Sequence, residues 1–327
     1  MEKSPELNNN QNLNSSLQRE KWCGHELLYK FQNFWFPLAY LEATQKVLAN
    51  FKPVPKDVIL ASFPKTGTTW LKALLHSIIN RSPKQDYNNH PLISNRPHDL
   101  IPSLETKLYV DQENDSKKTE FLAVKNPEDV RILATHIPYQ ILGEVLNSCE
   151  CKVVYVTRNP KDTLISLWHF VQKSHLFDED PWELEVAVDQ FCNGVVPFGP
   201  YYDHVLAYRQ ECLKRPQKVY FVTYEEIKEN PKHYVRKIGE FLGCPFEGEN
   251  GEEEIEEIVK FCSFENLSNQ EMNKSSELSI DFPMPYNSFF RKGEVGDHIN
   301  YLEDEMIQKI DAVTKEKFHG SDFVYGV

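Results

Sequence analysis

The sequence predicts an α/β fold, in which a central parallel sheet is flanked by helices on both faces. Four short apolar runs have the length and composition of buried strands: Val58–Phe63, Arg131–Thr135, Lys152–Thr157 and Val219–Thr223. A helical pattern follows each run, and strands that alternate with helices along a chain form parallel sheets. Such sheets bind ligands at the carboxyl ends of their strands, so the residues after each run are the first candidates for a site.

The expected helices are bounded by residues that commonly begin and end them. Asn159 suits an N-cap and Pro160 the first helical position, so a helix is predicted from Pro160 to about Lys173. Pro138 precedes another helix, and Gly243 ends a third. The other expected helices are Leu41–Asn50, Tyr139–Leu146, Trp182–Asn193, Tyr201–Lys214, Pro231–Leu242, Phe264–Asn273, Tyr301–Phe318 and one that starts at the acidic run Glu252–Glu257.

Three segments differ from this alternation. Residues 1–18 are polar and rich in asparagine, which predicts a disordered tail, and residues 19–327 are expected to form a single domain. Trp22–Phe51 is dense in aromatic residues without a clear period, which indicates core packing or the wall of an apolar pocket. Ser82–Asn126 is a long, polar, proline-marked connection of the kind that often serves as a lid or binding loop.

Composition excludes several classes of protein. The chain has 327 residues and a net charge of −13, which argues against a general binder of nucleic acid or of anionic membranes. Seven cysteines without a Cys-x-x-Cys pair indicate a reducing compartment, and the histidines lack metal-ligand spacing. No apolar run reaches the roughly 20 residues of a membrane span. We therefore expect a cytoplasmic protein without a metal, a nucleic-acid partner, a membrane anchor or an obligate protein partner.

The first strand run leads directly into a P-loop-like phosphate-binding turn, Pro64–Thr69, and then into an amphipathic helix. The first turn of a helix presents unpaired N–H groups and the positive end of the helix dipole. Lys65 adds a full charge, and Thr68 and Thr69 add hydroxyl donors. The turn is not a Walker A loop, because its lysine precedes Gly67 and no earlier glycine opens it. An ordinary capped strand–helix turn is the simpler alternative.

Polar residues also follow the other predicted strands, and each has an ordinary structural explanation when taken alone. Together they are expected to meet at one edge of the sheet, where two basic clusters predict two phosphates. Trp70 and Tyr224 offer aromatic surfaces for a base between them, so a nucleotide with phosphates at both ends of its ribose is indicated. The residues concerned are His136 after the second strand, Arg158 and Ser166 after the third, Tyr224 after the fourth, and Arg291 and Lys292 from a late loop.

In combination these motifs resemble the cytosolic sulfotransferases, and most closely their plant branch. The resemblance implies 3'-phosphoadenosine 5'-phosphosulfate as the donor and His136 as the catalytic base. The matching segments are Phe63–Leu71, Thr135–Pro138, Val156–Asp162, Ser166, Tyr224–Glu226, Cys262–Glu265 and Phe290–Gly293. The donor-binding residues that it implies are Lys65, Thr66, Gly67, Thr68 and Thr69 for the 5'-phosphosulfate, Trp70 and Tyr224 for the adenine, and Arg158, Ser166, Arg291, Lys292 and Gly293 for the 3'-phosphate.

The chemistry of sulfuryl transfer suits these residues independently of the resemblance. In-line transfer to a hydroxyl, like phosphoryl transfer, needs mostly alignment and charge stabilisation. His136 can accept the proton of the attacking hydroxyl, and Lys65 can neutralise charge on the bridging oxygen of the leaving nucleotide. The expected acceptor is a small plant metabolite, with a flavonoid or other phenolic first and a terpenoid, steroid or hydroxyjasmonate-like acid second. The expected pocket residues are Trp35, Phe36, Phe170 and Phe198.

Two other functions are compatible with parts of the sequence. A P-loop-type small-molecule kinase is disfavoured because the glycine-lysine order of its phosphate loop is missing. A non-catalytic nucleotide-binding module is disfavoured because both Lys65 and His136 are present. The chain also departs from the family pattern: Cys262 replaces a threonine near the donor nucleotide, and the dimer motif of the animal members is absent, so no oligomeric state is predicted.

Overall fold

The computed structural model describes residues 16–23, 26–82, 85–110, 121–123, 129–173, 182–277 and 284–325. The tail predicted over residues 1–18 lies outside the described residues except for its last three positions.

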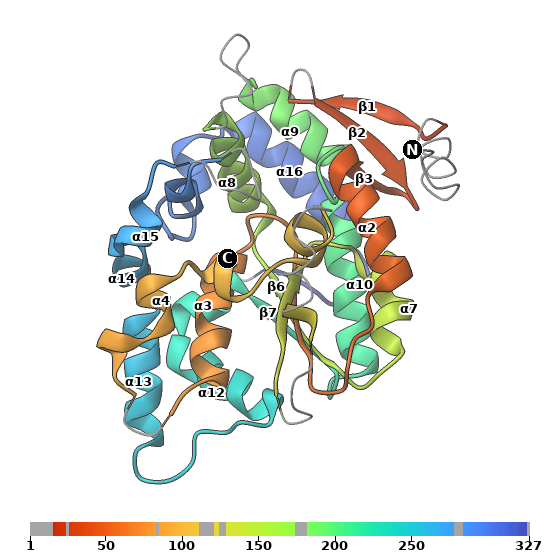
Figure 1. The fold of residues 1–327 in the computed structure, drawn as a ribbon. Coiled ribbons are helices and arrows are strands. Elements are labelled where there is room, and N and C mark those ends of the chain that lie inside the picture. The colour runs from red at the N-terminus through yellow and green to blue at the C-terminus, as the bar shows by residue number, and fades with distance from the viewer. Residues whose placement is uncertain are drawn as a thin grey trace.

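Four parallel strands form the central sheet in the order β5-β4-β6-β7 (Figure 1). They span Ile132–Thr135 (β5), Val58–Ser62 (β4), Lys152–Thr157 (β6) and Val219–Thr223 (β7). Every residue of β4 and β5 is buried, as expected of strands that are covered on both faces. The register aligns the strand ends, because Ala61 pairs with Thr135, Ser62 with Val156, and Thr157 with Thr223. The residues that follow the strands therefore emerge along one edge.

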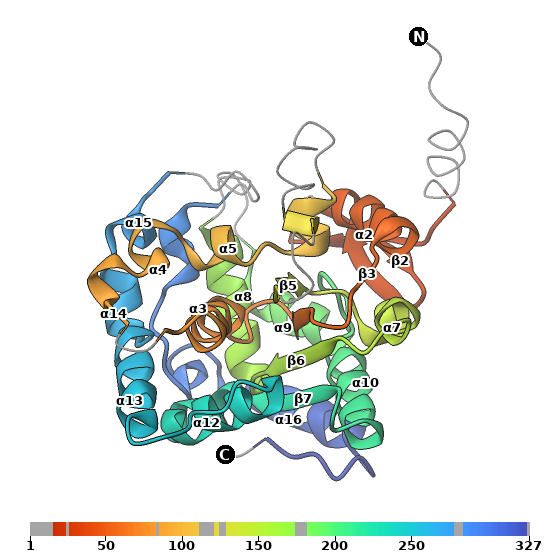
Figure 2. The same cartoon turned by 60° about the horizontal axis from the view of Figure 1, so that its bottom comes forward.

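Alternate side chains of each strand pack into cores on opposite faces of the sheet. Val58 and Leu60 face one core, which is completed by α3 (Thr68–Ile79), α12 (Pro231–Leu242) and α13 (Gly251–Phe261). Figure 2 shows these helices on one side of the strands and α2, α7 and α10 on the other. The predicted α/β architecture, with helices on both faces of a parallel sheet, is confirmed.

The opposite face is covered by the other three helices. Ile59 and Ala61 of β4 pack there against α2 (Leu38–Asn50), α7 (Tyr139–Asn147) and α10 (Tyr201–Lys214). A third core lies around α8 (Pro160–Gln172), α9 (Leu184–Cys192) and α16 (Asp304–Lys317). The structure thus confirms most predicted helices to within a few residues at their ends.

The aromatic-rich N-terminal segment forms a small antiparallel sheet, whose strands were not predicted from the sequence. Its strands are β1 (Arg19–Trp22), β2 (Glu26–Phe31) and β3 (Phe34–Pro37), in that order. Gln32 and Asn33 form the two-residue turn between β2 and β3, and both have positive φ, at 48° and 70°. This is the backbone geometry of a tight hairpin turn, here made without glycine.

The remaining elements are short and connect the layers. The segment predicted as the helix Phe264–Asn273 forms two helices, and one helix after β7 was not predicted. These elements are η1 (Tyr87–Asn89), α4 (Pro91–Ser94), α5 (Pro97–Leu100), η2 (Leu104–Leu108), α11 (Tyr224–Glu229), α14 (Phe264–Asn269), α15 (Glu271–Lys274), η4 (Tyr286–Phe289) and η5 (Asp297–Asn300). Within the described part of the chain, no helix combines the length and apolar composition needed to cross a membrane.

Candidate active site

The turn after β4 has the backbone geometry of an anion site. Lys65 and Gly67 have positive φ, at 70° and 113°, and α3 begins at Thr68 directly after them. A Cβ on Gly67 would lie only 2.8 Å from Cδ2 of Tyr224, so glycine is required there both by conformation and by space. The hydroxyl of Thr66 donates to the carbonyl groups of Phe63 and Val156, at 2.8 and 3.1 Å. These bonds fix the turn to the ends of β4 and β6, and they leave Thr66 only its backbone for a ligand.

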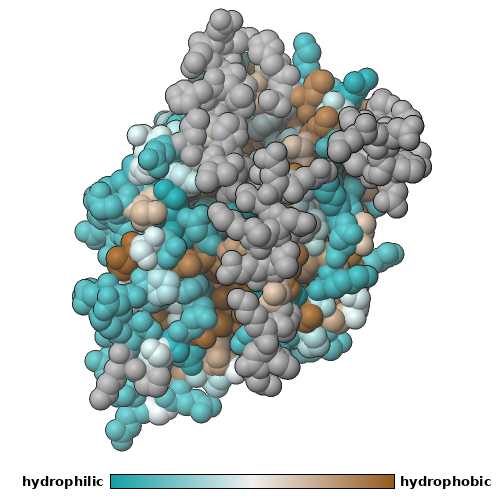
Figure 3. All heavy atoms as spheres, viewed as in Figure 1, coloured by the Kyte–Doolittle hydropathy of each residue, from teal (hydrophilic) through white to brown (hydrophobic). Residues whose placement is uncertain are grey.

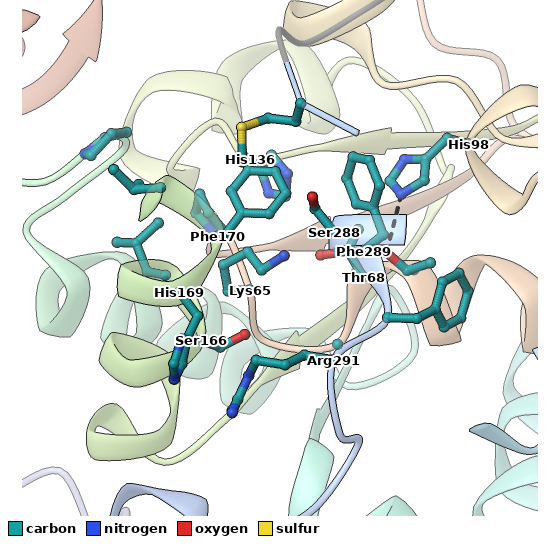
Figure 4. A pocket seen from close by; sticks show the side chains of 18 of the residues that line it. Lys65, Thr68, His98, His136, Ser166, His169, Phe170, Ser288, Phe289 and Arg291 are labelled. Atoms are coloured by element: carbon teal, nitrogen blue, oxygen red, sulfur yellow. Dashed lines mark hydrogen bonds between the residues drawn. The ribbon is translucent and has the colours of Figure 1, made fainter. Parts of the chain in front are cut away.

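Lys65 projects into a cavity of about 520 Å³ that lies at this edge of the sheet (Figure 4). Its Nζ lies 3.7 Å from the ring centroid of Phe170 and 5.5 Å from that of Phe289. Burial, together with repulsion from Arg291, Lys173 and Arg158, lowers the pKa of Lys65 to about 7. A bound anion would reverse this effect, because it would stabilise the charged form of the lysine.

His136 lies in the same cavity, immediately after β5. Its Nδ1 is 2.7 Å from the carbonyl oxygen of Ser62, and only a protonated nitrogen can donate to a carbonyl. The neutral ring therefore carries its lone pair on Nε2, as a general base requires. Burial lowers the pKa of His136 to about 4, despite the opposing effect of its bond to Ser62, so the ring is neutral at pH 7.

A buried carboxylate holds the backbone of this histidine in place. Oε1 of Glu105 accepts from the backbone N–H of His136 at 2.7 Å, and its Oε2 accepts from the hydroxyl of Thr135 at 2.8 Å. Burial raises the pKa of Glu105, although these hydrogen bonds oppose the shift. Glu105 lies in η2 and resembles an ordinary loop residue in the sequence, so it was not among the predicted site residues.

The second basic cluster lies around Arg158, at the end of β6. Nη2 of Arg158 donates to the carbonyl of Glu294 at 2.6 Å and lies 3.3 Å from Oδ2 of Asp162. The buried Nε of Arg158 finds no acceptor among the described residues. Ser166, two turns along α8, lines the same cavity (Figure 4). Arg158 lines this cavity as well, and a guanidinium group there suits a phosphate oxygen.

Arg291, Lys292 and Gly293 also line the cavity. Arg291 and Lys292 both form ion pairs with Asp297, and Nζ of Lys292 lies 2.6 Å from Oδ1. Gly293 has a φ of 68°, and a Cβ there would collide with the ring of Phe264. The structure therefore brings this late loop to Arg158 and Ser166, as the sequence predicted.

Trp70 and Tyr224 meet at the side of the cavity, but not as expected. Their ring centroids are 5.4 Å apart and their planes make an angle of 68°, so the rings touch edge to face. No slot remains for a base between them, and the predicted sandwich is wrong in this structure. Cζ of Arg158 lies over the ring of Tyr224, 4.7 Å from its centroid. Each ring still lines the cavity, so a base can pack against them from one side.

Aromatic residues form the apolar part of the cavity. Phe170 and Phe198 line it, and the rings of Phe198 and His136 lie 5.5 Å apart between centroids. Trp35 and Phe36 do not line it: they point to opposite sides of β3 and pack into two different cores. Tyr40, which stacks on Phe198, takes the place expected for them. On the face drawn in Figure 3, hydrophobic residues show near the middle and at the upper right, among hydrophilic ones.

Comparison with known proteins establishes the family. A model described as the sulfotransferase domain matches residues 55–322. Cytosolic sulfotransferase 5 of Arabidopsis thaliana is 41% identical over 309 residues, which cover 94% of this chain and 93% of that protein. The chain belongs to the sulfotransferase family. Flavonol 4'-sulfotransferase of Flaveria chlorifolia is 40% identical over 304 residues, which cover 92% and 91% of the two chains.

Solved sulfotransferase structures have the same fold. A structure of an Arabidopsis thaliana protein assigned to the sulphotransferases matches with a TM-score of 0.74 at 34% identity and covers 100% of this chain and 99% of its own. Mouse sulfotransferase SULT7A1, solved in complex with PAP, matches with a TM-score of 0.70 at 26% identity and covers 90% and 96% of the two chains. These similarities confirm the predicted resemblance.

In this sulfotransferase, Cys262 lies outside the cavity and contacts Trp70, which lines it. The residue is fully buried, its sulfur lies 3.4 Å from Oγ of Ser77, and it does not line the cavity. Its carbonyl oxygen accepts a hydrogen bond of 2.9 Å from the indole of Trp70. The exchange of threonine for cysteine therefore leaves intact the backbone contact that orients Trp70.

Proposed function

We propose that this sulfotransferase moves the sulfuryl group of 3'-phosphoadenosine 5'-phosphosulfate to a hydroxyl group of a small plant metabolite. The observation that carries the proposal is the meeting of His136 and Lys65 in one cavity that also contains a second basic cluster. Lys65 with the start of α3 supplies one anion site, and Arg158 with the loop at Arg291 supplies the other. A donor with phosphate groups at both ends of its ribose matches this pair of sites.

The residues present fit such a donor. Nε of Arg158 has no acceptor among the described residues, and the absence of a side chain at Gly67 keeps the turn open beside Tyr224. We assign the 5'-phosphosulfate to Lys65, Thr68, Thr69 and the backbone of the turn. The 3'-phosphate goes to Arg158, Ser166 and the segment Arg291–Gly293, and the adenine to the open sides of Trp70 and Tyr224.

Two residues carry the chemistry in this proposal. Nε2 of His136 accepts the proton of the acceptor hydroxyl as its oxygen attacks, and the bond from Nδ1 to Ser62 holds the ring in the required tautomer. The negative charge of the donor raises the pKa of His136 above its value in the ligand-free protein, which makes the ring a stronger base. Lys65 stabilises the negative charge that develops on the bridging oxygen as the sulfuryl group departs.

We propose a flavonoid or another phenolic as the acceptor. Phe170, Phe198 and Tyr40 present aromatic surfaces around His136, and flat aromatic ligands pack well against such walls. The similarity to a flavonol 4'-sulfotransferase supports this class. A hydroxylated terpenoid, a steroid and a hydroxyjasmonate-like acid are the alternatives, and a screen of one compound from each class with the same donor will separate them.

We also propose that the reaction takes place in the cytosol and needs no metal ion. The curated relatives are named cytosolic sulfotransferases, and we place this chain in the cytosol with them. We expect the reaction to proceed without a metal ion. Within the described residues, no group of three or more histidine, cysteine, aspartate or glutamate side chains is arranged to hold one. Addition of a chelator should therefore leave turnover unchanged.

The variant His136→Ala tests the proposed base. We expect turnover to fall by about 10²–10⁴-fold, the usual contribution of a general base. Calorimetry should still detect binding of 3'-phosphoadenosine 5'-phosphate, because the donor-binding residues are unchanged. His233→Ala, at the start of α12, is the surface control. Near-normal turnover in His136→Ala would refute the base, and binding of ATP with magnesium in preference to the adenosine bisphosphate would favour a kinase.

A further inference from the structure

A buried lysine and a histidine lie directly behind the phosphate-binding turn. Lys72 is only 1% exposed and lies one helical turn after Thr69 on α3. Its Nζ lies 3.0 Å from Nδ1 of His98 and 3.1 Å from Oγ of Ser103. Nε2 of His98 in turn lies 3.1 Å from Oγ1 of Thr69, the bond that is dashed in Figure 4. Lys72, His98 and Thr69 thus form one hydrogen-bonded chain that ends at the cavity.

The hydrogen-bonding capacities of Lys72, His98 and Thr69 determine which group donates and which accepts in each of these hydrogen bonds. An ammonium group has only donors, so Nδ1 of His98 must accept from Lys72. The ring proton of a neutral His98 then lies on Nε2 and is donated to Oγ1 of Thr69. Burial and the charge of Lys72 hold the pKa of His98 well below its ordinary value, which agrees with a neutral ring. With its oxygen engaged as an acceptor, Thr69 retains its own proton to donate.

That remaining proton belongs to the second residue of α3, at the helix end where an anion would bind. Thr69 is half-buried and lines the cavity together with Lys65 and Thr68. Hydrogen bonds in a chain polarise one another, and a charge at one end strengthens the bond at the other. Lys72 is therefore connected to the cavity although its own ammonium group does not line it.

We propose that Lys72 and His98 are positioning residues, which orient the hydroxyl of Thr69 toward the 5'-phosphate of the donor and strengthen its hydrogen bond. This inference rests on the proposed function, because it needs the 5'-phosphate at the start of α3. It assigns to the segment around His98 a role in donor recognition. Neither residue touches the reacting atoms in this proposal, and no proton moves along the chain.

Two ligands that differ only in the 5'-phosphate isolate the effect. Calorimetry would compare 3'-phosphoadenosine 5'-phosphate with adenosine 3'-phosphate on the wild type and on three variants: His98→Asn, His98→Gln and Thr69→Val. Asparagine can still accept from Lys72 but is too short to donate to Thr69, whereas glutamine can place an amide N–H near the position of Nε2. We expect His98→Asn and Thr69→Val to bind the bisphosphate about tenfold more weakly, as for the loss of one hydrogen bond to a charged group.

Three further binding measurements decide whether Lys72 and His98 act as positioning residues. Binding of adenosine 3'-phosphate should change less than about twofold in every variant, His98→Gln should recover part of the loss, and His98→Asn/Thr69→Val should lose no more than Thr69→Val alone. Additive losses, or equal losses for both ligands, would indicate a merely structural role and overturn the inference. If His98→Asn fails to fold, Lys72→Met gives the same comparison.

A separate readout distinguishes failure of this inference from failure of the proposed function. Nitrogen NMR of histidine-labelled protein should show His98 as a neutral ring protonated on Nε2, and the opposite tautomer would overturn the chain of bonds. A wild-type protein that binds no adenosine bisphosphate would overturn the proposed function and this inference with it. A wild type that binds it and transfers sulfate, with no selective loss in His98→Asn, would overturn this inference alone.

Discussion

The two proposed phosphate-binding ends of the cavity are built in different ways. The end at Lys65 comes from one continuous segment, in which strand, turn and helix N-terminus follow within a few residues. The end at Arg158 is assembled from α8 and a loop more than a hundred residues later, held by the buried carboxylates of Asp162 and Asp297. The first end therefore depends on local backbone geometry, and the second on tertiary contacts.

Removal of Lys65 tests the phosphate-binding end that comes from one continuous segment, here called the local end. This variant should have the largest effect. We expect Lys65→Met to lower turnover by about 10²–10³-fold, as for loss of a group that stabilises transition-state charge. Folding should be unaffected or slightly improved, because burial and nearby cations already disfavour the charged lysine. The measurements are steady-state kinetics and thermal unfolding. Lys173→Met, which removes another cavity lysine, is the control, and an equal loss in both variants would contradict a specific role for Lys65.

Replacement of Asp162 tests the end at Arg158, here called the assembled end because its residues come from distant parts of the chain. Its carboxylate is buried and accepts from the backbone N–H groups of Gly296 and His298, at 2.7 and 3.0 Å, and from Nδ1 of His298 at 2.8 Å. Burial alone would raise the pKa of Asp162, but these bonds and the charge of Arg158 outweigh it and hold the pKa below its ordinary value. Asp162 therefore connects Arg158 to the late loop.

We expect Asp162→Asn to lower the free energy of unfolding by about 3 kcal/mol, because it leaves buried partners of a charged group unmatched. Affinity for 3'-phosphoadenosine 5'-phosphate should fall with it. Because the folded-state pKa is lowered, the stabilisation is present above the unfolded-state pKa and is lost as the pH falls, so the variant should also show a flatter acid-denaturation profile. Asp311→Asn, which breaks an exposed ion pair with Lys161, should cost less than about 1 kcal/mol. Equal costs would contradict the anchoring role.

The same contrast explains what the sequence could and could not predict. The strands of the parallel sheet are continuous apolar runs because both faces are buried, and they were predicted to within about a residue. The hairpin of β2 and β3 was missed because Phe34, Trp35 and Phe36 are all buried, so no alternation marks the strand. For the same reason the sequence could not show that Trp35 and Phe36 pack into two cores and away from the cavity.

The same distinction applies to the candidate site: residues whose partners are near in the sequence could be predicted, and most of the others could not. The turn at Lys65 could be derived from its neighbours in the chain, and the residues after the other strands could be placed at the same edge from the parallel order. Glu105, His98 and Asp297 were not identified, because all three lie outside the strand–helix pattern. Glu105 and His98 also act through partners that are distant in the sequence. Their only sequence signal is a polar residue in a short irregular segment, which is common in any surface loop.

The smallest expected effect is a pH dependence that only the local end should show. The pKa of Lys65 is about 7 in the ligand-free protein, and the anionic groups of the donor should raise it. Above pH 7, binding then requires a proton to be taken up, so affinity for 3'-phosphoadenosine 5'-phosphate should fall by at most about tenfold per pH unit. The described cavity histidines are neutral at pH 8, because the ligand-free pKa values of His136 and His169 are lowered to about 4 and burial holds the pKa of His98 well below its ordinary value.

Calorimetry at pH 8 in two buffers with different ionisation enthalpies measures this proton directly. We expect an uptake that approaches one proton at pH 8 and is much smaller at pH 6, where Lys65 is already charged. Lys65→Met should abolish the uptake, while Arg158→Ala should weaken binding at every pH and leave most of the uptake in place. An uptake that persists in Lys65→Met would assign the proton to another group, and one that disappears in Arg158→Ala would mean that the two ends are not independent.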